Sequence, residues 1–319
     1  MKFTNIPKDF TPLCEGLIFE FDTEEVAGEV KIKIVDSKTG EVLGCKHLYD
    51  MTVGKIDVAP YVEHCVEATP HIDQNSSIEE ASLKHVVVYV NGEVSPEVVV
   101  STNRRFVALP SLVTTMPHRR RIAYGSCDNI ALHIEPEAMV NIYAEADTGE
   151  SLNLSYQTLS GAATVMLSTL DFNPETRSIE LQIWGNDVEV ATISYEVVPQ
   201  SATVTSLAWR SSAGSIEQYP FPVSRSVIQR IERIEATTAQ GEFTSSCRSE
   251  KLVQMVSNYE NRATIAALAE IVGAARVWFI DDSQAHGVKV ATSSVSLDSA
   301  ESPDRVELEV RLWRREEGF

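Results

Sequence analysis

Two short pairs of cysteine and histidine are the first candidates for chemistry in this sequence. Cys45 and His47 are two positions apart, and His64 and Cys65 are adjacent. Thiolates and imidazoles are ligands that zinc prefers, and a structural zinc site needs four of them in a tetrahedron. Adjacent side chains of a strand point to opposite faces, so His64 and Cys65 could meet at one ion only where the backbone is irregular. We therefore expect no metal and no cofactor at this set.

A pair of carboxylates and a run of arginines are the next candidates. Asp281 and Asp282 could act as the two carboxylates of a glycosidase, but they follow a β-rich run, where such neighbours usually form a turn. Arg119, Arg120 and Arg121 could contact nucleic acid or phosphate. In an acidic chain, a solvated strand edge or a salt-bridged interface is the better interpretation. The sequence contains no nucleophile elbow, His-Glu-x-x-His motif or phosphate-binding glycine loop, so we predict that the protein is not an enzyme.

Four tryptophans complete the candidates, at positions 184, 209, 278 and 313. Aromatic rings exposed on a β-sandwich can stack on sugars, so carbohydrate binding is the alternative to a place in the core. Trp278 stands between Val277 and Phe279, and Trp209 ends an apolar run, as is typical of buried positions. We predict that four aromatic residues of the last third of the chain belong to a core or an interface, namely Trp209, Tyr219, Phe221 and Trp278.

The composition predicts a folded chain with more than one domain. Of its 319 residues, 43% are hydrophobic and 23% are charged. Such a chain suits two or three cores of about 100 residues each. No segment approaches the roughly 20 apolar residues that span a membrane, and the first residues lack the apolar run of a secretory signal. Five scattered cysteines, at 14, 45, 65, 127 and 247, are expected to be reduced, buried thiols.

The net charge of −19 is shared unevenly along the chain. Residues 1–116 carry 10 Lys and Arg against 18 Asp and Glu, and residues 117–200 carry 4 against 12. Residues 201–319 are nearly balanced, with 13 against 16. The first two segments would repel nucleic acid, anionic membranes and each other's copies. The last segment suits a surface that packs against partners.

Alternating β-formers and turn residues predict a mainly β fold that begins with two sandwich-like domains. In residues 1–116, the pair Asn91-Gly92 between two β runs is a strong hairpin signal, and Gly40 is expected to take a positive φ in another turn. Residues 16–62 are expected as strands with short turns, residues 70–82 as a polar loop, and residues 101–121 as a connection.

The second predicted domain covers residues 117–200. It contains seven short β runs at a spacing of about ten residues, which is the rhythm of an immunoglobulin-like sandwich. Gly185-Asn186-Asp187 is expected to form a tight turn between the last two strands.

Residues 201–319 are predicted to form a β-rich α+β domain for assembly or docking, in which one helix covers a sheet. Its strands are expected at Thr203–Arg210, Ile216–Tyr219, Arg276–Ile280, Val288–Ala291 and Arg305–Trp313. Gly214 is expected to take a positive φ in the first hairpin. Ser257 and Glu260 have capping-box spacing ahead of an alanine-rich helix, which Gly273 would end in the left-handed conformation.

The last domain resembles a known family. Trp209, a polar turn with Gly214, and the aromatic pair Tyr219 and Phe221 are similar to a strand-turn-strand signature in virion structural proteins of tailed phages that infect Bacteroidetes, the crAss-like phages. In those proteins a helix rich in Leu and Ala leads into a Val-Trp strand, a lid strand and an alternating final strand, and the order of elements over residues 200–319 is similar. The resemblance implies a virion protein that is made in the host cytoplasm.

We therefore expect a structural component of a phage particle, located in the tail, connector or baseplate or attached to the capsid. It would act through protein–protein contacts in a symmetric assembly, with other copies of itself and other virion proteins as partners. We expect no membrane, nucleic acid or small-molecule partner. The alternative is a carbohydrate-binding or adhesin β-sandwich protein of a bacterial surface, which would require export.

Overall fold

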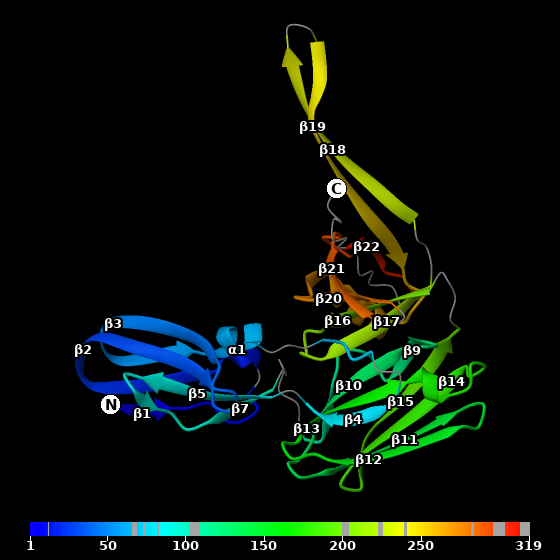
Figure 1. Cartoon of the computed structure of the whole chain (residues 1–319). Helices are drawn as coiled ribbons and strands as arrows, with labels where there is room; N and C mark the ends of the chain where they lie inside the picture. The colour runs from blue at the N-terminus through cyan, green and yellow to red at the C-terminus, as the bar shows by residue number, and fades with distance from the viewer. Residues whose placement is uncertain are drawn as a thin grey trace.

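The computed structural model of the chain is mainly β (Figure 1). Its described residues form three hydrophobic cores. It describes residues 1–11, 13–65, 69–72, 75–81, 83–101, 109–199, 204–222, 226–238, 241–281, 284–295 and 304–312. Two sandwich-like domains are followed by a β-rich domain with one covering helix, so the predicted fold class is confirmed. Within these residues, no helix has both the length and the apolar character needed to cross a membrane.

The first domain is a six-stranded antiparallel sheet that curls around its own core. Its strands are β1 (Lys2–Asn5), β2 (Ile18–Asp36), β3 (Val42–Asp57), β5 (Lys84–Val90), β6 (Glu93–Val94) and β7 (Val98–Val100). The start of β2 pairs with β1 and its end pairs with β5, while β3 follows its other side. This bend lets one sheet enclose Phe19, Phe21 and Ile34. β3 is therefore an edge strand of this sheet.

Two predicted turns of the first domain are confirmed. Asn91 and Gly92, with φ values of 50° and 93°, join β5 and β6. Positive φ at both central residues is what a tight two-residue hairpin needs. Gly40 has a φ of 73° in the turn between β2 and β3.

The prediction of strands throughout residues 16–62 is wrong at its end. There the chain forms a short helix, α1 (Ala59–Cys65), and a 3-10 turn at Leu13–Glu15 lies earlier in the domain. Pro60 suits the first turn of a helix, because a donor at that position has no partner within the helix. The Asp57 carboxylate accepts a hydrogen bond from the Ala59 backbone N–H at 3.0 Å and so helps the helix to start.

The second domain is a sandwich of two sheets. The smaller sheet has the order β4 (Ser77–Glu80), β13 (Ala162–Ser168), β10 (Cys127–His133) and β8 (Ser111–Val113). The larger has the order β12 (Ser151–Gln157), β11 (Met139–Ala146), β14 (Ser178–Gly185), β15 (Val188–Val198) and β9 (Arg119–Ala123). Inward residues such as Val140 and Ile142 alternate with outward ones and fill the space between the sheets. All seven predicted strands are present, and Asn186 and Asp187, both with positive φ, form the predicted turn.

Two strands of this sandwich come from the first 116 residues. β4 lies in the segment predicted to be a loop and pairs with β13, and β8 lies in the predicted connection and pairs with β10. β4 contributes the single core residue Ile78, so its own sequence carries too little alternation to reveal a strand. Because β5, β6 and β7 follow β4 in sequence, the chain passes between the first two domains three times.

The third domain is a seven-stranded sheet with a helix on one face. The strand order is β17 (Ile216–Pro222), β16 (Val204–Arg210), β20 (Val277–Asp281), β21 (Gln284–Val290), β22 (Glu307–Leu312), β19 (Gly241–Val256) and β18 (Ser226–Thr238). The helix α2 (Arg262–Ala269) runs into a 3-10 turn at Glu270–Gly273, and the two bury Ile265, Leu268 and Ile271. Gly214 has a φ of 99° in the predicted hairpin.

Both ends of α2 differ from the prediction. The residue that caps its start is Asn261, whose side chain accepts a hydrogen bond at 3.0 Å from the backbone N–H three residues later. Ser257 instead accepts a bond from the Val306 backbone N–H at 2.8 Å, and Glu260 binds a tyrosine of β17. The capping-box prediction is therefore wrong, because both side chains join distant segments. Gly273 ends the 3-10 turn without a left-handed φ.

The hairpin of β18 and β19 is the largest element that has no counterpart among the sequence predictions. Its isoleucines stand at positions 228, 231 and 234, three residues apart. This spacing matches no strand alternation, because it places successive isoleucines on opposite faces of a strand. Such a pattern suits a hairpin that has no single buried face.

Candidate functional site: the interdomain junction and a projecting hairpin

The four aromatic residues predicted for a core or an interface are all buried in the third domain. The exposed fraction is 0% for Trp209 and Tyr219, 1% for Phe221 and 7% for Trp278. Tyr219 and Phe221 meet edge to face, with 5.0 Å between their ring centroids, a geometry that aromatic pairs favour. Trp278 faces Ala208, the neighbour of Trp209, so the two indoles lie on opposite faces of the sheet.

The hydroxyl of Tyr219 begins a polar chain that reaches the second domain. It donates to Oε1 of Glu260 at 2.8 Å, and the same oxygen lies 2.7 Å from Nε of Arg121 on β9. Arg121 also places Nη1 2.8 Å from Oε1 of Glu196 on β15. Burial and the neighbouring carboxylate of Glu260 raise the pKa of Tyr219, so its hydroxyl stays a hydrogen-bond donor. A core aromatic residue thereby ties the third domain to the second.

A second polar cluster is buried between the same two domains. Nη1 of Arg120, on β9, lies 3.1 Å from Oδ2 of Asp128 on β10 and 3.7 Å from Oε2 of Glu217 on β17. The exposed fraction of these three residues is 4%, 4% and 1%. Tyr195 of β15 donates to the same Asp128 oxygen at 2.7 Å. One buried cation is thus shared by two carboxylates, one from each domain.

The electrostatics of this cluster follow from burial and proximity. Burial opposes the charge of Arg120, but Asp128 and Glu217 outweigh that effect and raise its pKa. Burial also raises the pKa of Glu217 against the opposing influence of Arg120. Glu217 accepts hydrogen bonds from Ser215 at 2.7 Å and from Thr114 at 2.8 Å. Removing one charge from such a cluster would leave the others buried without compensation.

The arginine run therefore has a structural role at this junction. Arg120 and Arg121 both pair with carboxylates of the second and third domains, whereas Arg119 is exposed. This arrangement confirms the salt-bridged interface as the interpretation of the run. We refer to the contacts of Arg120 and Arg121 together as the junction.

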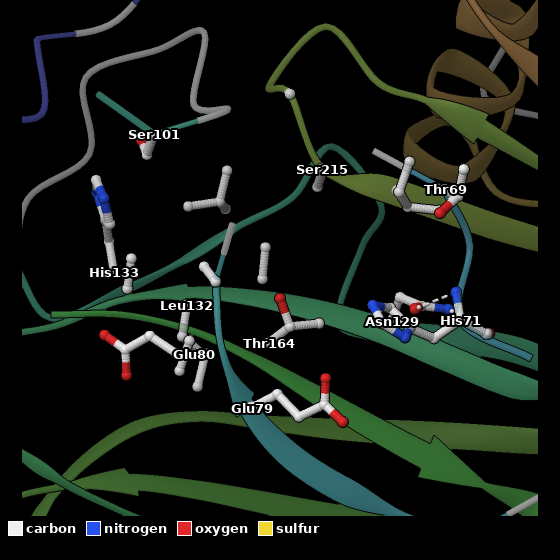
Figure 2. A pocket seen from close by; sticks show the side chains of 17 residues that line it. Thr69, His71, Glu79, Glu80, Ser101, Asn129, Leu132, His133, Thr164 and Ser215 are labelled. Carbon is white, nitrogen blue, oxygen red and sulfur yellow. Dashed lines mark hydrogen bonds between the residues drawn. The ribbon is translucent and has the colours of Figure 1, made fainter. Parts of the chain in front are cut away.

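A cavity of about 310 Å³ lies where all three domains meet (Figure 2). Ser101 follows β7 of the first domain, Thr164 belongs to β13 of the second, and Ser215 stands in the β16–β17 turn of the third. The Asn129 side chain accepts a hydrogen bond from the His71 backbone N–H at 3.0 Å, the dashed line in Figure 2. That bond holds the segment before β4 against β10 of the smaller sheet.

Two ionisable groups beside this cavity also hold neighbouring segments. Glu80 accepts hydrogen bonds from the Ser160 backbone N–H at 2.7 Å and from the Thr158 hydroxyl at 3.0 Å. Burial lowers the pKa of His133, whose ring is 4% exposed, and this favours the neutral imidazole. The ring meets Phe10 edge to face at 5.0 Å, which is a contact between the first and second domains. The Phe10–His133 contact holds the first domain against the second, whereas the Glu80 hydrogen bonds hold β4 within the second domain.

The cysteine and histidine set lies at the surface of the first domain. The prediction of a buried thiol is confirmed for Cys127 but is wrong for Cys45, which is exposed on β3. His47 is exposed on the same strand, and its Nδ1 lies 2.8 Å from Oε1 of Glu29. The side chains of His64 and Cys65 lie outside the described part of the chain. No group of three or more His, Cys, Asp or Glu that could hold a metal is found among the side chains that the structure describes.

The remaining candidates are dispersed. Asp281 is the last residue of β20 and pairs with Gln284 at the start of β21, and Asp282 lies outside the described residues. Trp184 is partly exposed on the outer face of the larger sheet of the second domain, opposite Asn141 of β11. Trp313 also lies outside the described residues.

The hairpin of β18 and β19 projects away from the third domain (Figure 1). Its base belongs to the sheet, since β22 pairs with residues 252–256 of β19. Beyond that base, residues 229–251 continue as a two-stranded structure, which we call the ribbon. The ten residues of β18 in it span about 34 Å at roughly 3.4 Å per residue. Ile231 and Ile234 are exposed there by 46% and 64%.

The charge of the hairpin also differs from that of the chain. Residues 226–256 carry four Lys and Arg and four Asp and Glu, whereas the whole chain has a net charge of −19. The hairpin is thus neutral on a strongly acidic protein. A neutral element can approach the acidic surface of another copy without like-charge repulsion.

Comparisons with known proteins identify no family for the chain. No protein-family model and no curated protein matches it. Among solved structures, E. coli alpha-2-macroglobulin in its native conformation is similar at 9% identity and a TM-score of 0.22, over 98% of this chain and 22% of that one. A mutant of Salmonella alpha-2-macroglobulin is similar at 9% identity and a TM-score of 0.23, over 91% and 24%. The chain spans about a quarter or less of the length of these proteins. TM-scores this low support no conclusion about the fold or the function of the chain.

The functional features that sequence patterns do not reveal are the junction and the ribbon. Glu217 stands in an otherwise apolar and amide-bearing strand, Ile216-Glu217-Gln218-Tyr219, and a lone acid there is a signal for a buried partner. Its partner Arg120 is almost a hundred residues away, so no local pattern identifies the pair. For the ribbon, the available signal is a long run of β-formers around Gly241 with charges of both signs.

Proposed function

We propose that the chain is a structural subunit of a phage particle that works by protein–protein contact in a symmetric assembly. Its place would be in the tail, connector or baseplate or on the capsid. The resemblance of residues 200–319 to virion proteins of crAss-like phages supports this proposal. The single observation that carries it is the ribbon.

The ribbon supports the proposal because, in the part of the chain that the structure describes, no third strand pairs with it. A two-stranded hairpin alone is at best marginally stable in water, because it needs a third strand or a second layer to cover its apolar side chains. Ile231 and Ile234 are exposed on it, and its long edges can pair with another chain. Contact with a partner would supply the missing strand and the missing layer.

The body of the protein supports the proposal in a different way. The chain crosses three times between the first two domains, and the junction joins the second domain to the third. These connections hold the domains in one arrangement. A stiff body that presents one projecting element is what a subunit needs if it is to set a fixed distance and angle to its neighbours.

The proposal is tested by incorporation into particles. The full chain and a short-ribbon variant would each be supplied during infection by the phage that encodes the chain, and particles would be purified by density and examined by mass spectrometry. In the variant an Asn-Gly turn joins Ile228 to Leu252, which face each other in the hairpin register. We expect the full chain in particles and the variant in the unassembled fraction. Particles that lack the full chain would refute the proposal.

A second candidate function, carbohydrate binding, is favoured by the outer face of the larger sheet of the second domain. Trp184 is partly exposed there, and Tyr143, exposed by 37%, stands diagonally across the β11–β14 pair. The amides of Asn141 and Gln182 complete the same face. Aromatic rings beside amides can stack on and hydrogen-bond to a sugar. Glycan-array binding that is lost in Trp184→Ala would support this function, and equal binding by the variant would exclude this face.

A further inference from the structure

Two long strand edges on different domains of this protein are complementary. We propose that the ribbon of one copy pairs with the edge of β3 in a second copy, so that copies associate head to tail. This inference rests on the proposed function and names its partner, which is another molecule of the same chain. Pairing through an added strand uses backbone hydrogen bonds that both edges can supply.

The acceptor edge is β3 of the first domain. β3 is 16 residues long and forms the edge of its sheet beside β2. Tyr49 and Val53, both on β3, are exposed by 61% and 65%, and Val26 of β2 by 73%. Long edge strands with exposed apolar side chains are sites where another strand can add. This edge therefore offers both backbone partners and apolar surface.

The donor is the ribbon, whose β18 is the terminal strand of the seven-stranded sheet. At 10 residues, its part of β18 is shorter than β3. Asp50 has a φ of 53° in β3 and the ribbon has a register shift between Ile234 and Glu235, so the two edges can pair in shorter regular stretches on either side of these irregularities. Ile231 and Ile234 would pack on apolar side chains of the acceptor edge. This contact would remove apolar surface of both partners from water.

The distribution of charge favours this pairing over contacts between bodies. Residues 1–116 carry 10 basic and 18 acidic residues, so two first domains repel each other. The hairpin, with four of each sign, is free of that repulsion. Lys46 and Lys55 on β3 and Arg233 on the ribbon also allow pairs with acidic residues of the opposite edge.

The arrangement of the two edges makes the contact heterologous. In Figure 1 the ribbon points to the top of the view, away from the body, whereas β3 lies in the first domain at the left. Each copy therefore donates with one end and accepts with another. Such contacts close into a ring when the rotation between copies allows it, and otherwise extend into a filament.

The inference is tested with two complementary variants of the full chain. The short-ribbon variant described above lacks the donor and keeps β3. An edge variant, Tyr49→Lys with Val53→Lys, keeps the ribbon and charges the acceptor edge, as natural edge strands do. Leu159→Lys is the matched control, because Leu159 is exposed by 75% on the second domain. Circular dichroism and thermal unfolding verify that each variant folds, and light scattering over a concentration series gives the mass.

We expect the wild type and Leu159→Lys to form oligomers larger than a dimer, and each complementary variant alone to be monomeric. An equimolar mixture of the two variants should form a dimer and nothing larger, because only one donor and one acceptor remain. An edge variant that associates as well as the wild type overturns the inference and points to ribbon–ribbon contact. A monomeric wild type also overturns it, while incorporation into particles can still be observed through another virion protein.

A cross-linking test remains valid even if the edge variant fails to fold. Cys45 is an exposed thiol on β3. Because Cys247 of β19 already lies on the ribbon, Ile231→Cys or Ile234→Cys would be made together with Cys247→Ser, so that the introduced cysteine is the thiol tested there. A disulfide requires Cα atoms within about 7 Å, so it reports direct adjacency. We expect disulfide-linked multimers with at least one of these variants and a loss of these multimers when Cys45→Ser is added. Multimers that persist with Cys45→Ser would place the ribbon elsewhere.

Discussion

The junction and the ribbon use the same residue types for opposite purposes. In the junction, Arg120 and Glu217 are buried between two domains, Arg121 is partly buried, and each has a defined partner. In the ribbon, arginines, glutamates and isoleucines are neighbours in sequence on a hairpin that leaves the body. Buried charges are costly to separate, whereas exposed ones contribute little to stability. Burial, and not composition, therefore decides whether such residues hold one chain together or are available to another.

The largest expected effect is the removal of the shared cation. Arg120→Ala leaves Asp128 and Glu217 without their buried partner and should lower the free energy of unfolding by about 3–5 kcal/mol. Urea unfolding followed by tryptophan fluorescence measures the change. Arg119→Ala is the control, since Arg119 is an exposed neighbour and its loss should stay within about 0.5 kcal/mol. Equal losses in the two variants would contradict the difference in burial.

A smaller loss is expected where one hydroxyl of the junction is removed. Tyr219→Phe deletes the hydroxyl that donates to Glu260 and accepts from the Asn258 backbone N–H at 3.2 Å. The hydrogen bond to the charged group alone contributes about 1.5–3 kcal/mol. Tyr143→Phe is the control, because its hydroxyl lies 3.4 Å from Glu145 on an exposed face. Thermal and urea unfolding should separate the two variants clearly. If Tyr143→Phe lost as much stability as Tyr219→Phe, the exposed hydrogen bond would contribute as much as the bond at the junction, which would contradict this prediction.

The pH dependence of stability should have opposite signs at two carboxylates. The pKa of Glu217 is raised above its ordinary value of 4.5, so its contribution is complete below 4.5 and is lost as pH rises through the folded value. The pKa of Glu80 is lowered: burial opposes the shift, but hydrogen bonds from Ser160 and its neighbours prevail. Its contribution is present above 4.5 and is lost as pH falls.

These signs are measured by urea unfolding of glutamine variants across pH. Glu217→Gln should gain stability relative to the wild type as pH rises above 4.5. The deficit of Glu80→Gln should shrink as pH falls below 4.5. Parallel pH profiles for both variants would show that the two carboxylates do not differ as inferred.

The smallest effect on stability is expected in the ribbon. Ile231→Lys changes a side chain that is 46% exposed, so the free energy of unfolding should change by no more than about 0.5 kcal/mol. The same substitution should reduce self-association, since it places a charge where apolar contact is proposed. Unfolding and light scattering on one sample compare the two outcomes. A large loss of stability would mean that the ribbon contributes to the folded core.

Local patterns were sufficient for much of the fold. Asn91-Gly92 and Asn186-Asp187 marked tight turns correctly, because a positive φ is tied to few residue types. The prediction for the start of α2 was wrong, because Ser257 and Asn261 both suit a cap. The choice depends on a distant residue, since the Val306 backbone N–H donates its hydrogen bond to the Ser257 hydroxyl. β4 escaped prediction because its pairing with β13 lies more than eighty residues away.

The amino-acid sequence by itself determined the mainly β architecture, the seven strands of the second domain and the buried character of Trp209 and Tyr219. These follow from alternation and turn chemistry, which act over a few residues. Only the tertiary structure decided that Arg120 faces Glu217 and that residues 229–251 leave the body as a ribbon. The reason is that burial and pairing depend on segments distant in sequence, and no local pattern records which of them meet.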